Sequence, residues 1–142
     1  MDDVRSAPTA GIVACLATLL VLALPYVLVT EGSAVTAYYN AGAITPLAAG
    51  LFCLVAVIAF AAGREERSDP ALVAGAGLVF GAFIFLISLS WAVTVPASVA
   101  LQLGEAQGVV ATLLEFHRFL LVLVAAGVPA SAGWYARALR LL

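Results

Sequence analysis

The segment DPALVAGAGLVFGAFIFLISLSW (residues 69–91) indicates the fold of the whole chain. Asp69 offers a side-chain oxygen suited to capping a helix, and Pro70 suits the first helical position. No charged residue follows as far as Trp91, and a helix over this length would measure about 32 Å. The hydrocarbon core of a membrane is about 30 Å thick. The segment therefore predicts a transmembrane helix with Trp91 in an interfacial aromatic belt.

Long charge-free stretches recur along the chain. Of the 142 residues, 65% are hydrophobic and 10% are charged, whereas a soluble domain carries about 25% charged residues. The amphipathic stripe of a soluble helix bundle is also missing from these stretches. We therefore predict an all-α fold, a single multi-pass domain over residues 1–142 in the cell membrane. Its four spans are expected at about residues 9–30, 45–63, 70–93 and 115–135.

The ends of the predicted spans follow from local signals. Thr45 and Pro46 indicate the start of the second span, and Pro25 is expected to kink the first. Between the third and fourth spans, two alternatives stay open. Residues 97–107 form a short interfacial helix, or the fourth helix starts near Gly108 and projects beyond the bilayer.

The arginines predict the orientation. Arg5, Arg64, Arg67, Arg137 and Arg140 all fall on one side of the predicted topology, and the loops 31–44 and 94–110 on the other side contain no basic residue. The positive-inside rule then places both termini in the cytoplasm.

Aromatic residues at the ends of the spans are expected at the headgroup level. These residues are Tyr38 and Tyr39 in the outer loop, and Trp134 and Tyr135 on the inner side. A cleaved signal peptide is an alternative for the first apolar segment, but its start, MDDVR, is acidic on balance.

In this layout the chain resembles uncharacterised small four-span membrane proteins of haloarchaea. Stretches such as AFAAGREERSDPALVAG (59–75), together with basic residues that are all arginine, carry the resemblance. It implies no activity.

Several function classes are disfavoured by residue types that the chain lacks. It has no lysine for a retinal Schiff base, one histidine where a four-helix b-type cytochrome needs two per haem, and no Cys-x-x-Cys for disulfide exchange. Cys15 and Cys53 are expected to be small core residues. Because no basic patch is present, nucleic-acid binding is not expected. We expect no enzyme activity, cofactor, catalytic residue or dedicated metal site.

The segment LLEFHRFLL (113–121) contains three ionisable residues. Counted back from Trp134, Arg118 lies about 24 Å away along a helix, near the outer edge of the bilayer. Its spacing from Glu115 predicts an ion pair at the outer interface, with His117 facing the headgroups or the outer loops. A ligand site at His117 would need Glu31 or Glu105 as well, because Glu115 points about 200° away from it.

Small residues provide the one positive functional pattern, because such residues let membrane helices approach closely. The residues predicted to pack are Ala74, Gly77, Gly81 and Ser88 on the third span and Ala126, Ala130 and Gly133 on the fourth. They serve packing within the chain, or else contact with a second copy or a larger membrane complex. We therefore expect a non-enzymatic accessory or scaffold subunit. The alternative is a small oligomeric transporter or channel, with Pro25 and Pro129 freeing backbone carbonyls.

Overall fold

The computed structural model describes residues 2–29, 31–96, 98–99 and 109–142. Within these residues all regular structure is helical, which confirms the predicted all-α class. The helices are α1 (Asp2–Leu28), α2 (Gly32–Asn40), α3 (Leu47–Arg64), α4 (Pro70–Thr94) and α6 (Val109–Ala138). Four of them, α1, α3, α4 and α6, are long and apolar enough to cross a membrane.

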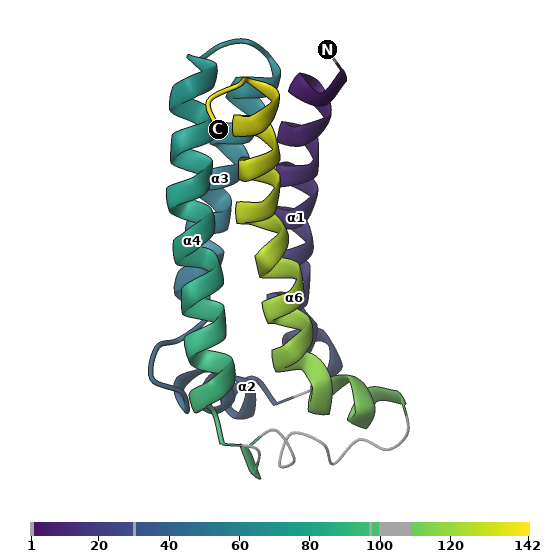
Figure 1. Cartoon of the computed structure of the whole chain (residues 1–142). Coiled ribbons are helices and arrows are strands. Elements are labelled where there is room, and N and C mark those ends of the chain that lie inside the picture. Colours follow the sequence, from purple (N-terminus) through teal and green to yellow (C-terminus); the bar gives the residue numbers. More distant parts are fainter. Residues whose placement is uncertain (1, 30, 97, 100–108) are drawn as a thin grey trace.

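The four long helices pack side by side as a ring (Figure 1). Helices α1 and α4 each contact both α3 and α6, so α1 and α4 lie on one diagonal of the ring. Both chain termini and the α3–α4 turn lie at one end, which we call the terminal end. The short helix α2, the last turn of α4 and the first turn of α6 lie at the other end, which we call the loop end (Figure 1).

The predicted helix starts agree with the structure to different degrees. Helix α4 begins at Pro70, and the Asp69 carboxylate accepts a hydrogen bond from the Ala71 N–H at 2.9 Å, as a capping residue should. Helix α3 begins at Leu47, two residues later than predicted, and its N–H lies 3.4 Å from the Thr45 hydroxyl. Helix α1 begins at Asp2, well before residue 9, because the polar first turn continues the helix beyond the apolar segment.

Helix α6 begins at Val109, six residues before the predicted fourth span. The residues directly before Val109 lie outside the described part of the chain, so both alternatives for the region between the third and fourth spans stay open. The interfacial helix expected at residues 97–107 falls almost entirely outside the described residues.

The turn GREERSD closes α3 with a backbone motif that is usually built on glycine. The Arg67 N–H bonds to the Ala62 carbonyl at 2.8 Å, while Glu66 between them has a φ of 57°. This is a Schellman-type C-cap. The turn therefore reverses the chain within a few residues and brings α4 directly beside α3.

The centre of the ring is filled by one aromatic side chain between two glycines. The Phe60 side chain of α3 is fully buried. A Cβ atom on Gly11 of α1 would come within 2.7 Å of the Phe60 ring, and one on Gly77 of α4 within 3.0 Å. Neither neighbour can carry a side chain there, so the missing side chains of α1 and α4 make the space that Phe60 occupies.

The predicted small residues of α4 lie on its buried face. Ala74, Gly77, Gly81 and Ser88 are all buried, and a Cβ on Gly81 would come within 2.7 Å of the Pro129 backbone nitrogen in α6. The two glycines of the GxxxG pattern thus contact different neighbours. Gly77 packs against the Phe60 ring, and Gly81 packs against the α6 backbone.

The small residues predicted for the fourth span do not lie on the face of α6 that packs within the chain, which leaves the alternative of contact with a second copy or a partner untested. Ala130 is exposed, Ala126 and Gly133 are half-buried, and a Cβ on Gly133 would meet nothing within 4 Å among the described atoms. The buried face instead carries Ala125, Val128 and Ala132. Small residues are so frequent between 125 and 133 that two faces fit the pattern, and spacing alone could not choose between them.

We predict that Gly81→Leu destabilises the fold much more than Gly75→Leu. A leucine side chain introduced at position 81 would collide with the backbone of α6, and overpacking of this kind typically costs about 1–3 kcal/mol or more. Gly75 is an exposed glycine on the same helix with nothing within 4 Å of its Cβ position, so it is the matched control. Thermal unfolding of the detergent-purified variants measures the difference. Equal midpoints for the two variants would contradict close packing of α4 on α6.

Candidate functional site

Pro25 leaves one backbone carbonyl of α1 without its helical hydrogen bond. In a regular helix the N–H of residue 25 would bond to the carbonyl of Val21, but proline has no N–H. The Nε2 atom of His117, on α6, lies 2.7 Å from the Val21 carbonyl oxygen. A carbonyl oxygen only accepts hydrogen bonds, so Nε2 carries the hydrogen and donates it. A side chain from another helix therefore replaces the backbone donor that Pro25 removed.

The second ring nitrogen of His117 is also occupied. Its Nδ1 lies 3.1 Å from the hydroxyl of Tyr38 on α2. With the hydrogen on Nε2, Nδ1 of a neutral imidazole accepts, and the Tyr38 hydroxyl donates. Burial raises the pKa of Tyr38 far above its usual value, so this hydroxyl keeps its proton. His117 is 2% exposed and joins α1, α2 and α6 through two hydrogen bonds.

A second tyrosine of α2 ties the same turn of α1. The Tyr39 hydroxyl donates to the Leu22 carbonyl, next to Val21. Burial and the neighbouring Tyr38 and Tyr26 raise the pKa of Tyr39, so it too remains a donor. Helix α2 is thus anchored to the turn of α1 that precedes Pro25.

These polar groups lie within a cluster of rings, which we call the loop-end cluster: Tyr38, Tyr39, Trp91 and His117. Tyr38 meets Trp91 edge-on, with ring centroids 5.0 Å apart, and stacks on Tyr39 at 5.5 Å. The Trp91 ring lies edge-on to His117 at 6.0 Å. Such aromatic pairs add to the stability that burial alone provides. The cluster joins α1, α2, α4 and α6 at the loop end.

The chain after α2 passes close to Trp91. A Cβ on Gly42 would come within 2.6 Å of the Trp91 ring, so this position needs glycine. The next residue is held by a hydrogen bond of 2.8 Å from the Ala43 N–H to the Thr94 hydroxyl of α4. The connection from α2 to α3 therefore encloses the loop-end cluster.

The aromatic residues at the loop end are covered by the chain itself. Tyr38, Tyr39 and Trp91 were expected at the headgroup level, and all three are fully buried. His117 does meet the outer loop through Tyr38, as one of its two predicted settings had it, but it is buried within the chain and does not face the headgroups. The reason is that residues 32–40 fold as a helix that turns its rings inward.

The predicted ion pair between Glu115 and Arg118 is not formed. Glu115 is exposed, whereas Arg118 Nη1 donates to the Val95 carbonyl at 3.2 Å and its guanidinium lies over the Phe119 ring. Val95 is the C-cap of α4, where carbonyls lack helical partners and the helix dipole favours a cation. Arg118 therefore binds the end of a neighbouring helix, and Glu115 stays in the polar surroundings.

The ligand site considered at His117 does not assemble from the described residues. Within them, no three His, Cys, Asp or Glu side chains come together in a way that would hold a metal ion. Glu31 is exposed, and Glu105 lies outside the described residues. Both His117 nitrogens are already engaged, so the cluster as it stands is suited to joining helices and has no ring nitrogen free for a ligand.

Two features of this region escaped the sequence reasoning. The link between Pro25 and His117 had a usable signal, because a proline inside a span frees the carbonyl four residues earlier and His117 was the one histidine able to meet it. The approach of Cys15 to Cys53, two free and fully buried thiols in the same core cluster, had none, since it depends on how α1 and α3 face each other.

The chain belongs to a family of unknown function (DUF7548), whose model matches residues 1–140. No curated protein and no solved structure matches it.

We predict that the effects of Pro25→Ala and His117→Ala are strongly coupled. His117→Ala in the native chain leaves the buried Val21 carbonyl without a donor, which costs about 1–3 kcal/mol beyond the lost packing. With alanine at position 25, a backbone N–H is available to that carbonyl, so His117→Ala should destabilise the Pro25→Ala chain less. Unfolding of the two single variants and the double variant gives the coupling. Additive effects would show that His117 does not serve the carbonyl freed by Pro25.

Proposed function

We propose that this member of the unknown-function family is an integral membrane protein that acts as a non-enzymatic subunit, either self-associating or part of a larger complex. The four long helices suit a membrane in length and apolar composition. Their outward surfaces also carry large apolar side chains, such as Val13, Leu20 and Ile58, each at least 60% exposed. Lipid or partner helices would cover these side chains.

The observation that carries the scaffold role is the filling of the ring. Phe60 occupies its centre between Gly11 and Gly77, and Gly81 admits the α6 backbone. At the loop end, the cluster around His117 ties four helices together. The buried hydroxyls of Thr18, Tyr39 and Ser131 also bond to backbone carbonyls of the chain, which suits a scaffold that presents a stable helical surface.

In the proposed orientation, the terminal end faces the cytoplasm. Arg5, Arg64, Arg67, Arg137 and Arg140 belong to the helix ends, the turn and the tail at this end (Figure 1). At the loop end, the described residues contain one arginine, Arg118, which is bound to the Val95 carbonyl. This asymmetry supports cytoplasmic termini by the positive-inside rule.

A small transporter is the second candidate, and one observation favours it. Pro25 interrupts the backbone bonding of α1 where a histidine and a tyrosine are buried, and broken helices with nearby polar groups mark the binding sites of many transporters. A transport cycle would have to break the hydrogen bonds of His117.

We predict that cysteine placed at Ala34 or Ser98 is labelled by an impermeant thiol reagent from outside intact cells. Ala34 lies in α2 at the loop end, whereas Ser68 lies in the α3–α4 turn. Ser68→Cys is the matched control and should react only after the membrane is opened. The native Cys15 and Cys53 are buried and should not contribute. Labelling of Ser68→Cys alone in intact cells would reverse the orientation.

We also predict that the purified chain, reconstituted alone in liposomes, shows no selective ion or solute flux. In mild detergent extracts of its native membranes it should migrate as an assembly larger than the 14.5 kDa monomer. A monomer that carries selective flux, lost in Tyr38→Phe and His117→Ala but kept in Gly75→Leu, would favour the transporter.

A further inference from the structure

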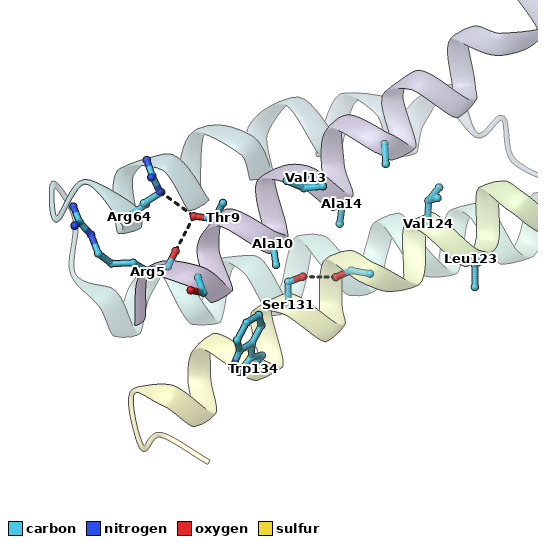
Figure 2. A pocket seen from close by; sticks show the side chains of 13 residues that line it. Arg5, Thr9, Ala10, Val13, Ala14, Arg64, Leu123, Val124, Ser131 and Trp134 are labelled. Atoms are coloured by element: carbon cyan, nitrogen blue, oxygen red, sulfur yellow. Dashed lines mark hydrogen bonds between the residues drawn. The ribbon is translucent and has the colours of Figure 1, made fainter. Parts of the chain in front are cut away.

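A groove of about 710 Å³ runs along the outside of the ring between α1 and α6 (Figure 2). On α1 it extends from Arg5 to Ala17, and on α6 from Leu123 to Trp134. Twelve residues of helix correspond to about 18 Å, close to the depth of one leaflet of a ~30 Å hydrocarbon core. The groove thus occupies the half of the chain nearest the terminal end.

Small side chains make the body of this groove. Ala10 and Ala14 of α1 face Gly127 and Ser131 of α6, and a Cβ on Gly127 would lie only 3.2 Å from the Ala14 Cβ. The Ser131 hydroxyl donates to the Gly127 carbonyl at 2.7 Å, so it is turned onto its own helix. The body of the groove is therefore apolar and lined by small side chains, which leave room for a hydrocarbon chain.

The terminal end of the groove is cationic. Figure 2 shows Arg64 of α3 reaching over to Thr9 of α1, where its Nε donates to the threonine hydroxyl at 2.9 Å. That hydroxyl donates in turn to the Arg5 carbonyl at 2.7 Å. Arg64 is thereby fixed at the mouth of the groove beside Arg5. No carboxylate lines the groove, and the Arg5 guanidinium makes no hydrogen bond or ion pair within the described part of the chain.

We propose that this groove binds an anionic membrane lipid, with its phosphate between Arg5 and Arg64 and one hydrocarbon chain along Ala10 and Ala14. The inference rests on the proposed placement in a membrane. Charge and shape argue for it together: the two guanidinium groups complement a phosphate, and the apolar groove continues from them to the depth of a leaflet. Trp134 at the rim is 41% exposed, at the level where aromatic residues meet headgroups.

Glu65 competes with the lipid for Arg64. Its carboxylate accepts from Arg64 Nη1 at 3.2 Å, but both side chains are about half exposed, at 45% and 51%. Ion pairs with this exposure are weak. An incoming phosphate can displace Glu65, and removal of the Glu65 charge should strengthen lipid binding.

The experiment uses the full chain in phosphatidylcholine vesicles that contain a small, increasing fraction of brominated phosphatidylglycerol. Bromine quenches tryptophan, so binding is read as quenching in excess of that given by brominated phosphatidylcholine, which also corrects for the second tryptophan, the buried Trp91. Arg5→Gln with Arg64→Gln should weaken the preference for phosphatidylglycerol roughly tenfold or more. Ala10→Leu, which fills the groove, should weaken it with the charges intact, and Glu65→Gln should strengthen it.

The matched control is Arg137→Gln with Arg140→Gln. It removes the same charge from the same end, at residues that do not line the groove, and should leave the preference unchanged. An equal loss of the phosphatidylglycerol preference in this control would show that surface potential alone explains the effect, and it would overturn the site. Displacement of the lipid by glycerol phosphate alone would overturn it too, because the ligand would then be a soluble phosphate. Extraction of the chain from the vesicles by alkaline carbonate would refute the membrane placement, whereas an integrated chain without lipid preference would refute the lipid site alone.

Discussion

A backbone carbonyl without a hydrogen-bond donor is the constraint that organises the loop end of this protein. In hydrocarbon no bulk water is present to satisfy such a group, so a carbonyl freed by a proline is stabilised when another part of the chain supplies a donor. Pro25 removes the N–H that the Val21 carbonyl would receive, and His117 supplies one from α6. To do so, His117 must hold its hydrogen on Nε2, and Tyr38 then becomes the donor to Nδ1. One proline thus accounts for the buried histidine, its tautomer and the docking of α2 over α1.

The rest of the ring depends on glycines, which have no side chain and let neighbouring helices approach closely, and not on further polar contacts. In lipid the hydrophobic effect gives little reason for helices to associate, so close contact has to provide the attraction. Gly11, Gly77 and Gly81 allow this contact, the first two around Phe60 and the third against Pro129. The two prolines are therefore accommodated differently, Pro25 by a hydrogen-bond donor and Pro129 by a glycine that gives its ring room.

Much of this fold was predictable because the membrane imposes a length on each helix and excludes charge from it. The start of α4 at Pro70 and the buried small face of that helix followed from local signals. The face of α6 did not, because small residues occur on both of its sides and only the position of α4 selects Ala125 and Ala132 over Ala126 and Ala130. The site was harder still. Tyrosine is a typical interfacial residue, so the residue types of Tyr38 and Tyr39 favoured the headgroup level. Their burial follows from the folding of residues 32–40 as a helix, which the loop sequence did not signal.

The two ends of the molecule differ in how their arginine side chains are placed, and this difference bears on how the chain works. At the loop end, Arg118 donates to the carbonyl at the C-cap of α4, and aromatic rings surround the hydrogen bonds of His117. At the terminal end, Arg5 and Arg64 stand at the mouth of an open apolar groove with no carboxylate in its lining. Both ring nitrogens of His117 at the loop end are therefore engaged within the chain, whereas the terminal end presents cationic groups at an open groove. Arg5, which has no partner among the described residues, and Arg64, whose exposed ion pair with Glu65 is weak, make the terminal end the more favourable place for the proposed lipid.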